Sequence, residues 1–199
     1  MLLSDAKSKL IKWAGIMLFI FFIINDGHAQ VSYVGNGLKV VIEGTSNIHD
    51  WEMESNQASC NANFQMNGNA ITGLNNLSLN LLAESLKSGK GAMDKNTYKA
   101  MVTDKYPRIS FVVSQANTKA SGANTYTISA KGKLSISSGV KDVWIAANCT
   151  VNPDKSISVA GSYKLNMSEY NVTPPSIMFG SIVVGDPITV KFNFVLKAQ

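Results

Sequence analysis

The chain has 199 residues, of which 45% are hydrophobic and only 16% are charged, and its formal net charge at pH 7 is +5. This length fits one domain, and the hydrophobic content excludes a mainly disordered protein. The positive charge is far below the dense Lys/Arg footprint of a nucleic-acid-binding protein, so no nucleic-acid partner is expected. Few charged residues beside many Ser, Asn and Thr residues favour an all-β fold.

The N-terminal segment, residues 1–29, is predicted to be a secretory signal peptide. Three lysines precede an uncharged run from Trp13 to Ile24, and Gly27-His28-Ala29 places small residues where a signal peptidase reads them before Gln30. A membrane anchor is the alternative, but spanning a bilayer takes about 20 apolar residues, and this run is shorter. Cleavage removes three lysines and two aspartates, which lowers the net charge from +5 to +4.

The mature domain, residues 30–199, is therefore expected in the periplasm or outside the cell, with no stable membrane span. Alternating apolar and polar runs, bounded by turn residues, predict its strands. They cover residues 38–42, 51–66, 74–82, 108–115, 125–137, 140–151, 156–167 and 187–197. Short turns predict antiparallel hairpins. Eight such strands in one domain predict a single up-and-down barrel without exposed edges, and a two-sheet sandwich is the alternative.

A basic segment between the third and fourth predicted strands interrupts the alternation. The sequence DKNTYKAMVT, residues 94–103, predicts a short helix that begins near Asp94 and carries Tyr98, Met101 and Val102 on one side. Tyr106-Pro107 ends the helix and returns the chain to extended geometry. We expect this helix to cap or flank the barrel.

Each predicted strand carries one apolar face, which is expected to point inward. In the last strand Ile188, Val190, Phe192 and Phe194 share one face, while Lys191 lies on the other. An eight-stranded barrel is just wide enough to be filled by such side chains or to hold one small ligand. The periodicity leaves both interpretations open.

Cys60 and Cys149 remain in the mature chain. An even cysteine count in an exported protein permits one disulfide, which requires the two Cβ atoms to lie within about 4 Å of each other. The sequence does not give this distance, so a disulfide and two buried free thiols are equal alternatives. With His49 as the remaining histidine of the mature chain, neither a metal site nor a cofactor is expected. His49 and Asp50 are adjacent and point to opposite faces in an extended chain, which is poor evidence for catalysis.

Several motifs occur in a fixed order along the chain. They are SLKSG (85–89), YKAMVTDKYPRISF (98–111), GKLSI (132–136), LNMSEYNVTPP (165–175) and VGDPITVKFNF (184–194). Together they resemble the YceI-like family of exported lipid- and polyisoprenoid-binding proteins over nearly the whole mature chain. One departure from the family pattern lies at residues 47–52, where many relatives have Ser after the histidine. Here Asp50 and Trp51 follow His49 and are expected to alter one mouth of the barrel.

The resemblance implies a lipocalin-like barrel whose apolar tunnel holds an isoprenoid lipid or a quinone-like amphiphile, for carriage or storage. The inward faces and the helix then supply the tunnel lining: Leu79, Leu81, Met93, Met101, Phe111, Val113, Leu134, Ile136, Tyr163, Leu165, Phe192 and Phe194. Basic residues at the mouth are candidates for binding the lipid head group: Lys87, Lys90, His49 and Arg108. The alternative for these residues is a solvated loop.

Two other functions stay open. A filled barrel would act as a structural or stress-related exported protein through its surface. An enzyme acting on an isoprenoid would need His49 as its acid or base, although no Gly-x-Ser-x-Gly or His-Glu-x-x-His motif occurs. We expect a binding protein and no enzyme, with a long-chain lipid as its partner. A homodimer is compatible with this expectation.

Overall fold

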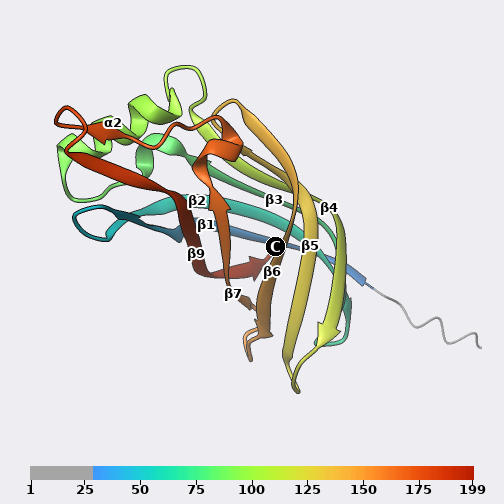
Figure 1. Cartoon of the computed structure of the whole chain (residues 1–199). Coiled ribbons are helices and arrows are strands. Elements are labelled where there is room, and N and C mark those ends of the chain that lie inside the picture. Colours follow the sequence, from blue (N-terminus) through green and yellow to red (C-terminus); the bar gives the residue numbers. More distant parts are fainter. Residues whose placement is uncertain (1–28) are drawn as a thin grey trace, which may run out of the picture.

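The computed structural model describes residues 29–199, so residues 1–28 of the predicted signal peptide lie outside the described part of the chain. Eight long strands close into one antiparallel barrel, which confirms the predicted all-β up-and-down barrel (Figure 1). These strands are β1 (Ala29–Ser46), β2 (Trp51–Asn67), β3 (Ala70–Leu82), β4 (Arg108–Ala120), β5 (Thr125–Ile136), β6 (Gly139–Val151), β7 (Ile157–Asn166) and β9 (Ile182–Ala198). Strand β9 pairs with β7 and with β1, which closes the ring. A two-residue strand, β8 (Ser176–Ile177), pairs with the start of β9.

Alternation in the sequence produces the inside and the outside of the barrel. In β5 the side chains of Tyr126, Ile128, Ala130 and Leu134 are buried, and the alternate residues Thr127, Ser129, Lys131 and Lys133 are more exposed. Strand β1 is where prediction and structure differ most, because it begins at Ala29 and not at residue 38. Its pairing with β2 shifts on both sides of Leu38, and such irregularities interrupt the alternation by which a strand is recognised.

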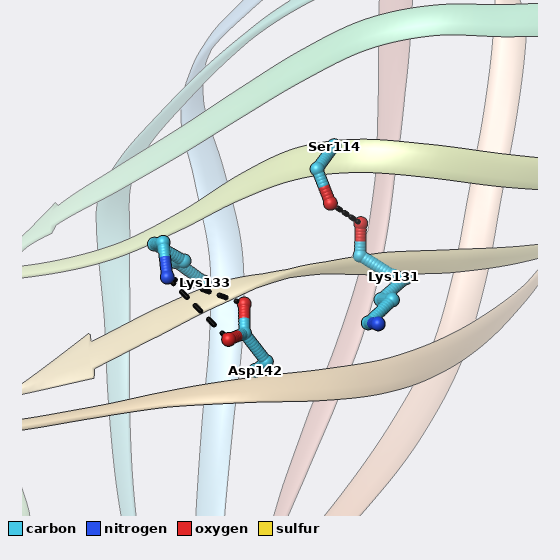
Figure 2. Close-up of polar contacts among 4 residues, drawn as sticks. All are labelled: Ser114, Lys131, Lys133 and Asp142. Atoms are coloured by element: carbon cyan, nitrogen blue, oxygen red, sulfur yellow. Dashed lines mark hydrogen bonds and ion pairs between the residues drawn. The ribbon is translucent and has the colours of Figure 1, made fainter.

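A β-bulge bends β4 around the barrel. Val113 pairs with Gly132 and Gln115 pairs with Lys131, which leaves Ser114 between them without a partner residue. The Ser114 hydroxyl donates a hydrogen bond to the carbonyl of Lys131 at 3.3 Å (Figure 2). An extra residue of this kind increases the local bend and twist of a strand, as closure of a barrel requires.

An ion pair joins two strands on the outer surface. The Lys133 ammonium of β5 lies 3.4 Å from the Asp142 carboxylate of β6, and both side chains are exposed (Figure 2). Exposed pairs of this kind contribute little to stability.

The predicted helix is α2 (Gly91–Met101), which begins three residues earlier and ends two residues earlier than expected. Val102 ends it in a left-handed conformation with φ 53°, and the Thr103 N–H donates to the carbonyl of Tyr98 at 3.1 Å. This bond pattern is typical of a helix C-terminus. Val102, expected on one side of the helix with Tyr98 and Met101, lies just past its end with an exposed side chain, whereas Met101 is buried. Within residues 29–199 no helix is long and apolar enough to cross a membrane.

The segment that contains α2 covers one end of the barrel, and we call residues 83–107 the cap segment (Figure 1). It starts with a short 3₁₀ helix, Ala83–Ser85. Its two ends are joined by the Ala83 N–H, which donates to the carbonyl of Pro107 at 2.9 Å. Glu54 of β2 and Lys87 exchange two backbone hydrogen bonds of 2.8 Å, so the cap segment is also bound to β2.

Packed side chains fill the opposite end of the barrel. The rings of Tyr33 and Phe64 meet edge to face with centroids 5.4 Å apart. Ile157 and Leu196 beside them are fully buried. The barrel is thus closed at this end by its own core.

The two cysteines are free, buried thiols, so the disulfide that the sequence permits is not formed. Cys60 lies on β2 and Cys149 on β6. These strands are four places apart in a ring of eight, so the cysteines occupy opposite walls of the barrel. Their Cβ atoms therefore lie well beyond the separation of about 4 Å that a disulfide needs.

Candidate functional site

A cavity of about 440 Å³ lies inside the barrel between the packed end and the cap segment. Its volume falls within the range of about 300–1,000 Å³ that is usual for small-molecule pockets. All eight barrel strands contribute inward side chains to its wall. On β5 the lining extends from Ile128 to Ile136, which is about 26 Å along the strand at ~3.3 Å per residue. Since barrel strands tilt by roughly 40°, the cavity is about 20 Å deep.

The lining is almost entirely apolar, and it contains all twelve residues that the sequence places in the tunnel. These are Leu79, Leu81, Met93, Met101, Phe111, Val113, Leu134, Ile136, Tyr163, Leu165, Phe192 and Phe194. Ten of them lie on barrel strands, where the two residues from each strand are two positions apart and point to the same side. The two methionines come from α2. Alternation on the strands and i, i+3, i+4 spacing on the helix therefore bring them together.

Other lining residues were missed by the sequence interpretation. Ile177 of β8 and Ile182 at the start of β9 belong to a segment without clear alternation. Tyr170 belongs to a second 3₁₀ helix, Met167–Tyr170. The signal available in the sequence was that residues 171–185 contain no charged residue. No charged side chain therefore marks a solvent-facing side of this segment.

Two of the four predicted head-group residues lie at the cavity. Lys90 and His49 are part of its lining, at the mouth beside α2. Lys87 points elsewhere, since its ammonium donates to the Tyr98 hydroxyl at 2.7 Å. Arg108 is exposed at the start of β4, outside the lining.

The histidine at the mouth is oriented by the main chain. The Nδ1 atom of His49 lies 2.8 Å from the carbonyl oxygen of Asp50, and the ring is exposed. A carboxylate facing the ring, as a catalytic histidine uses, is not among its hydrogen-bond partners in residues 29–199. The arrangement suits a contact with a ligand's polar end.

Trp51 forms part of the mouth wall. Its indole Nε1 donates a hydrogen bond to the carbonyl of Thr45 at 2.9 Å, across the turn between β1 and β2. The ring packs against Gly44, where an added Cβ would come within 2.2 Å of the indole. Trp51 thus lines the cavity and also a shallow surface hollow beside it, to which Asp50 belongs as well.

Two tyrosines, Tyr163 and Tyr170, belong to the cavity wall. Tyr170 is fully buried, and its hydroxyl has no hydrogen-bond partner in the described part of the chain. Burial raises the pKa of Tyr170 and also that of its neighbour Tyr163, so both phenols stay protonated at neutral pH. The Cys149 thiol, which also lines the cavity, has a pKa raised to about 12 by burial. A thiol of this kind is inert because the thiolate is the nucleophile.

The geometry is that of a deep apolar container with His49 and Lys90 at its mouth. It can shelter an elongated apolar group from water and hold one polar end near His49 and Lys90. Within residues 29–199 no cluster of three or more His, Cys, Asp and Glu side chains is placed to hold a metal ion.

The YceI-like domain family matches residues 23–196 of the chain. Among solved structures, Burkholderia cenocepacia BcnA is similar, with a TM-score of 0.62 and 20% identity over 83% of this chain and 96% of that chain. A polyisoprenoid-binding domain from Saccharophagus degradans, implicated in plant cell wall breakdown, has a TM-score of 0.65 and 11% identity over 86% and 100% of the two chains. A Campylobacter jejuni YCEI protein has a TM-score of 0.53 and 14% identity over 72% and 81%. No curated protein matches the chain.

Proposed function

The chain belongs to the YceI-like family, and we propose that it binds the apolar chain of an isoprenoid lipid or a quinone-like amphiphile inside its barrel. It would carry or store this lipid outside the cytoplasm, after export directed by residues 1–29. The observation that supports the proposal is the apolar cavity of about 440 Å³ with His49 and Lys90 at its mouth. The Saccharophagus degradans relative is described as a polyisoprenoid-binding domain, which supports this ligand class.

The depth of the cavity fits one lipid chain. A chain that spans one leaflet of a bilayer is about 15 Å long, half of the hydrocarbon thickness of ~30 Å. The cavity is about 20 Å deep when measured along its lining on β5. One extended chain therefore fits, and a longer chain has to fold back or protrude through the mouth.

The polar end of the ligand would lie at the mouth. Lys90 supplies a cation and His49 a ring nitrogen beside the apolar wall. Phosphate or carbonyl oxygens bind such groups through hydrogen bonds, which are stronger when the donor is charged. Burial of the apolar chain, at roughly 25 cal/mol per Å² removed from water, would supply most of the affinity.

We propose binding without covalent chemistry. No carboxylate is among the hydrogen-bond partners of the His49 ring in residues 29–199, and the cavity thiol of Cys149 is protonated. The alternative of a filled barrel that acts through its surface is disfavoured, since packing fills only the end opposite the cap segment.

Mass spectrometry of the exported protein tests the proposal. The chain is expressed with its signal peptide, and native and denaturing spectra of the purified protein are compared, followed by organic extraction. A stoichiometric mass shift that disappears on denaturation, with an isoprenoid in the extract, is the expected result. A native mass equal to the denatured mass, before and after incubation with long-chain isoprenoids, would contradict it.

A pair of neighbouring substitutions on β6 separates cavity binding from surface binding. Ala147 lines the cavity, and Ala146 next to it is exposed on the outer surface. Ala147→Phe should fill the space that the ligand occupies and abolish the mass shift. Ala146→Phe adds the same ring outside and should leave it unchanged. Loss of the ligand in both variants, or in neither, would place the binding site elsewhere.

A further inference from the structure

The turn between β8 and β9 carries large apolar side chains into solvent at the mouth of the cavity. Ile177 and Ile182 at its two ends line the cavity. Between them Phe179 is fully exposed and Met178 is 68% exposed. The apolar wall of the cavity thus continues outward into an apolar tip.

The backbone of this turn disfavours the residues that occupy it. Met178 and Phe179 have φ values of 53° and 54°, in the left-handed region that bulky side chains rarely adopt. Backbone bonds from Gly180 to Ile177 and from Ser181 to Met178, both 3.2 Å, hold this geometry. Asn or Gly would fit such a turn better. The backbone conformation does not favour Met178 and Phe179 at these positions, and their side chains are not buried within the chain. Contact with another molecule is the remaining explanation for two large apolar side chains here.

Another exposed apolar residue, Ile48, lies beside the tip. Asn47, in the turn between β1 and β2, donates to the carbonyl of Ser181 at 3.0 Å and exchanges hydrogen bonds with Val183 at 2.9 and 3.1 Å. The next residue, Ile48, is 58% exposed. We call Ile48, Met178, Phe179 and Val183 the mouth patch. Figure 1 shows both turns at the end of the barrel where α2 lies.

Charge around the mouth patch favours a lipid bilayer as its partner. Residues 171–185, which include the tip, contain no charged side chain, so the tip can enter an apolar phase without burying a charge. Lys90, Lys95 and Lys99 are exposed on the neighbouring cap segment, where they can meet lipid phosphates. The rim also carries Asp50 and Glu52, so insertion of the apolar tip contributes more than attraction to anionic lipid.

A second protein surface fits this patch less well. A stable protein interface covers about 800 Å² on each partner. One turn tip with four apolar side chains offers much less, whereas an amphipathic surface that inserts a few apolar side chains among head groups is sufficient for reversible membrane binding.

We propose that the mouth patch docks the protein on a lipid bilayer, with the cavity mouth facing the acyl chains. Docking in this orientation would let a lipid pass between the membrane and the cavity without crossing water. The transfer of a lipid rests on the proposed lipid-binding function. Binding to the bilayer does not, since the protein without a ligand carries the same mouth patch.

Flotation of the mature protein with vesicles of phosphatidylcholine and phosphatidylglycerol tests the proposal. The informative variant is Met178→Asn with Phe179→Gly, because Asn-Gly favours the left-handed turn and should keep or raise the melting temperature. Removal of two insertable side chains should weaken vesicle binding about tenfold or more. Val195→Asn removes an exposed apolar residue near the packed end and should bind vesicles like the unchanged protein.

The outcomes separate docking from lipid binding. Ligand retention by the double variant is measured by native mass spectrometry, and it should be unchanged, since neither residue lines the cavity. Failure of the unchanged protein to bind vesicles, or equal binding by the double variant, would overturn the docking proposal while ligand retention still tests the function. A concentration-dependent dimer in sedimentation that the double variant loses would assign the patch to a second copy and would also overturn the proposal.

Discussion

The ammonium group of Lys87 donates a hydrogen bond to the hydroxyl of Tyr98 at 2.7 Å and lies 5.0 Å from the centre of its ring. The Tyr98 hydroxyl in turn lies 2.9 Å from the carbonyl oxygen of Glu84 and 2.7 Å from that of Leu86. One phenol thus joins α2 to the part of the cap segment that is bound to β2. The contact also raises the pKa of Lys87, because the hydrogen bond favours its charged form.

Tyr98→Phe should loosen the cap segment without removing the ring that packs there. Loss of the hydroxyl should lower the free energy of unfolding by about 1 kcal/mol, as is usual for one hydrogen-bonding group. Amide hydrogen exchange in residues 84–101 should become faster, and bound lipid should leave sooner. The control is Tyr106→Phe, whose hydroxyl makes no side-chain hydrogen bond within residues 29–199. Equal exchange rates in both variants would mean that Tyr98 does not hold the cap segment.

Gly44→Ala should displace Trp51 from the mouth. An added Cβ would come within 2.2 Å of the indole ring, so the ring has to move and its hydrogen bond to Thr45 is lost. Overpacking of this kind costs about 1–3 kcal/mol. A denaturant unfolding curve measures the loss, and tryptophan fluorescence should shift toward that of an exposed indole.

The matched glycine for this experiment is Gly91 at the start of α2. An added Cβ there meets no atom within 4 Å, and its φ is not in the left-handed region. Gly91→Ala should keep the fluorescence unchanged and stabilise the helix by up to about 1 kcal/mol. If Gly44→Ala behaves in the same way, Trp51 does not depend on Gly44 for its position.

The barrel and its lining were predictable because side-chain parity is a local property. Once Phe192 faces inward, Phe194 does so too, because no β-bulge separates them in β9. The placement of Lys87 and Arg108 was not predictable in this way. A long cation at the edge of an element can turn to several partners, and Lys87 binds Tyr98 only because the cap segment folds back on itself.

The mouth patch depends on contacts that no local pattern encodes. Asn47 meets Ser181 and Val183 across more than 130 residues of chain, so the two turns could not be placed side by side from the sequence. The relation between Cys60 and Cys149 is similar, since it follows from their strands lying on opposite sides of a closed ring. Distances between residues on different strands depend on how the strands close into a barrel, which no local sequence pattern specifies.

Acid should loosen the mouth through two aspartates that anchor it. Asp94 of α2 accepts bonds from the Ser88 hydroxyl and N–H at 2.6 and 2.8 Å, and Asp186 accepts bonds from the hydroxyl and N–H of Ser168. These bonds hold the pKa of each carboxyl below its ordinary value of 3.8. A lowered pKa in the folded state means stability that is present above pH 3.8 and is lost as the pH falls through the folded value.

Hydrogen exchange or thermal melting between pH 7 and pH 2.5 measures this effect. Stability from these contacts should stay constant down to about pH 4 and then fall. Asp94→Asn should be less stable than the unchanged protein at pH 7 and should approach it at low pH, because the charge on the acceptor is gone. Asp104→Asn, in the same segment and without a hydrogen bond to its carboxylate within residues 29–199, should keep the full pH dependence. The same pH dependence in both variants would exclude Asp94 as an anchor.

Tyr170→Phe should stabilise the protein, in contrast to most substitutions in a core. The hydroxyl is fully buried, and no group in the described residues, its neighbour Tyr163 included, meets it with the distance and angles of a hydrogen bond. An unsatisfied buried polar group costs about 1–3 kcal/mol. Its removal should raise the free energy of unfolding of the ligand-free protein by about 1 kcal/mol in a denaturant titration. Tyr33→Phe is the control of opposite sign, since the Tyr33 hydroxyl donates to the carbonyl of Lys155 at 3.2 Å and its loss should destabilise the barrel by a similar amount. Destabilisation by Tyr170→Phe in the lipid-loaded protein alone would show that the ligand supplies the missing partner, whereas destabilisation of both forms would show that the hydroxyl is already satisfied without it.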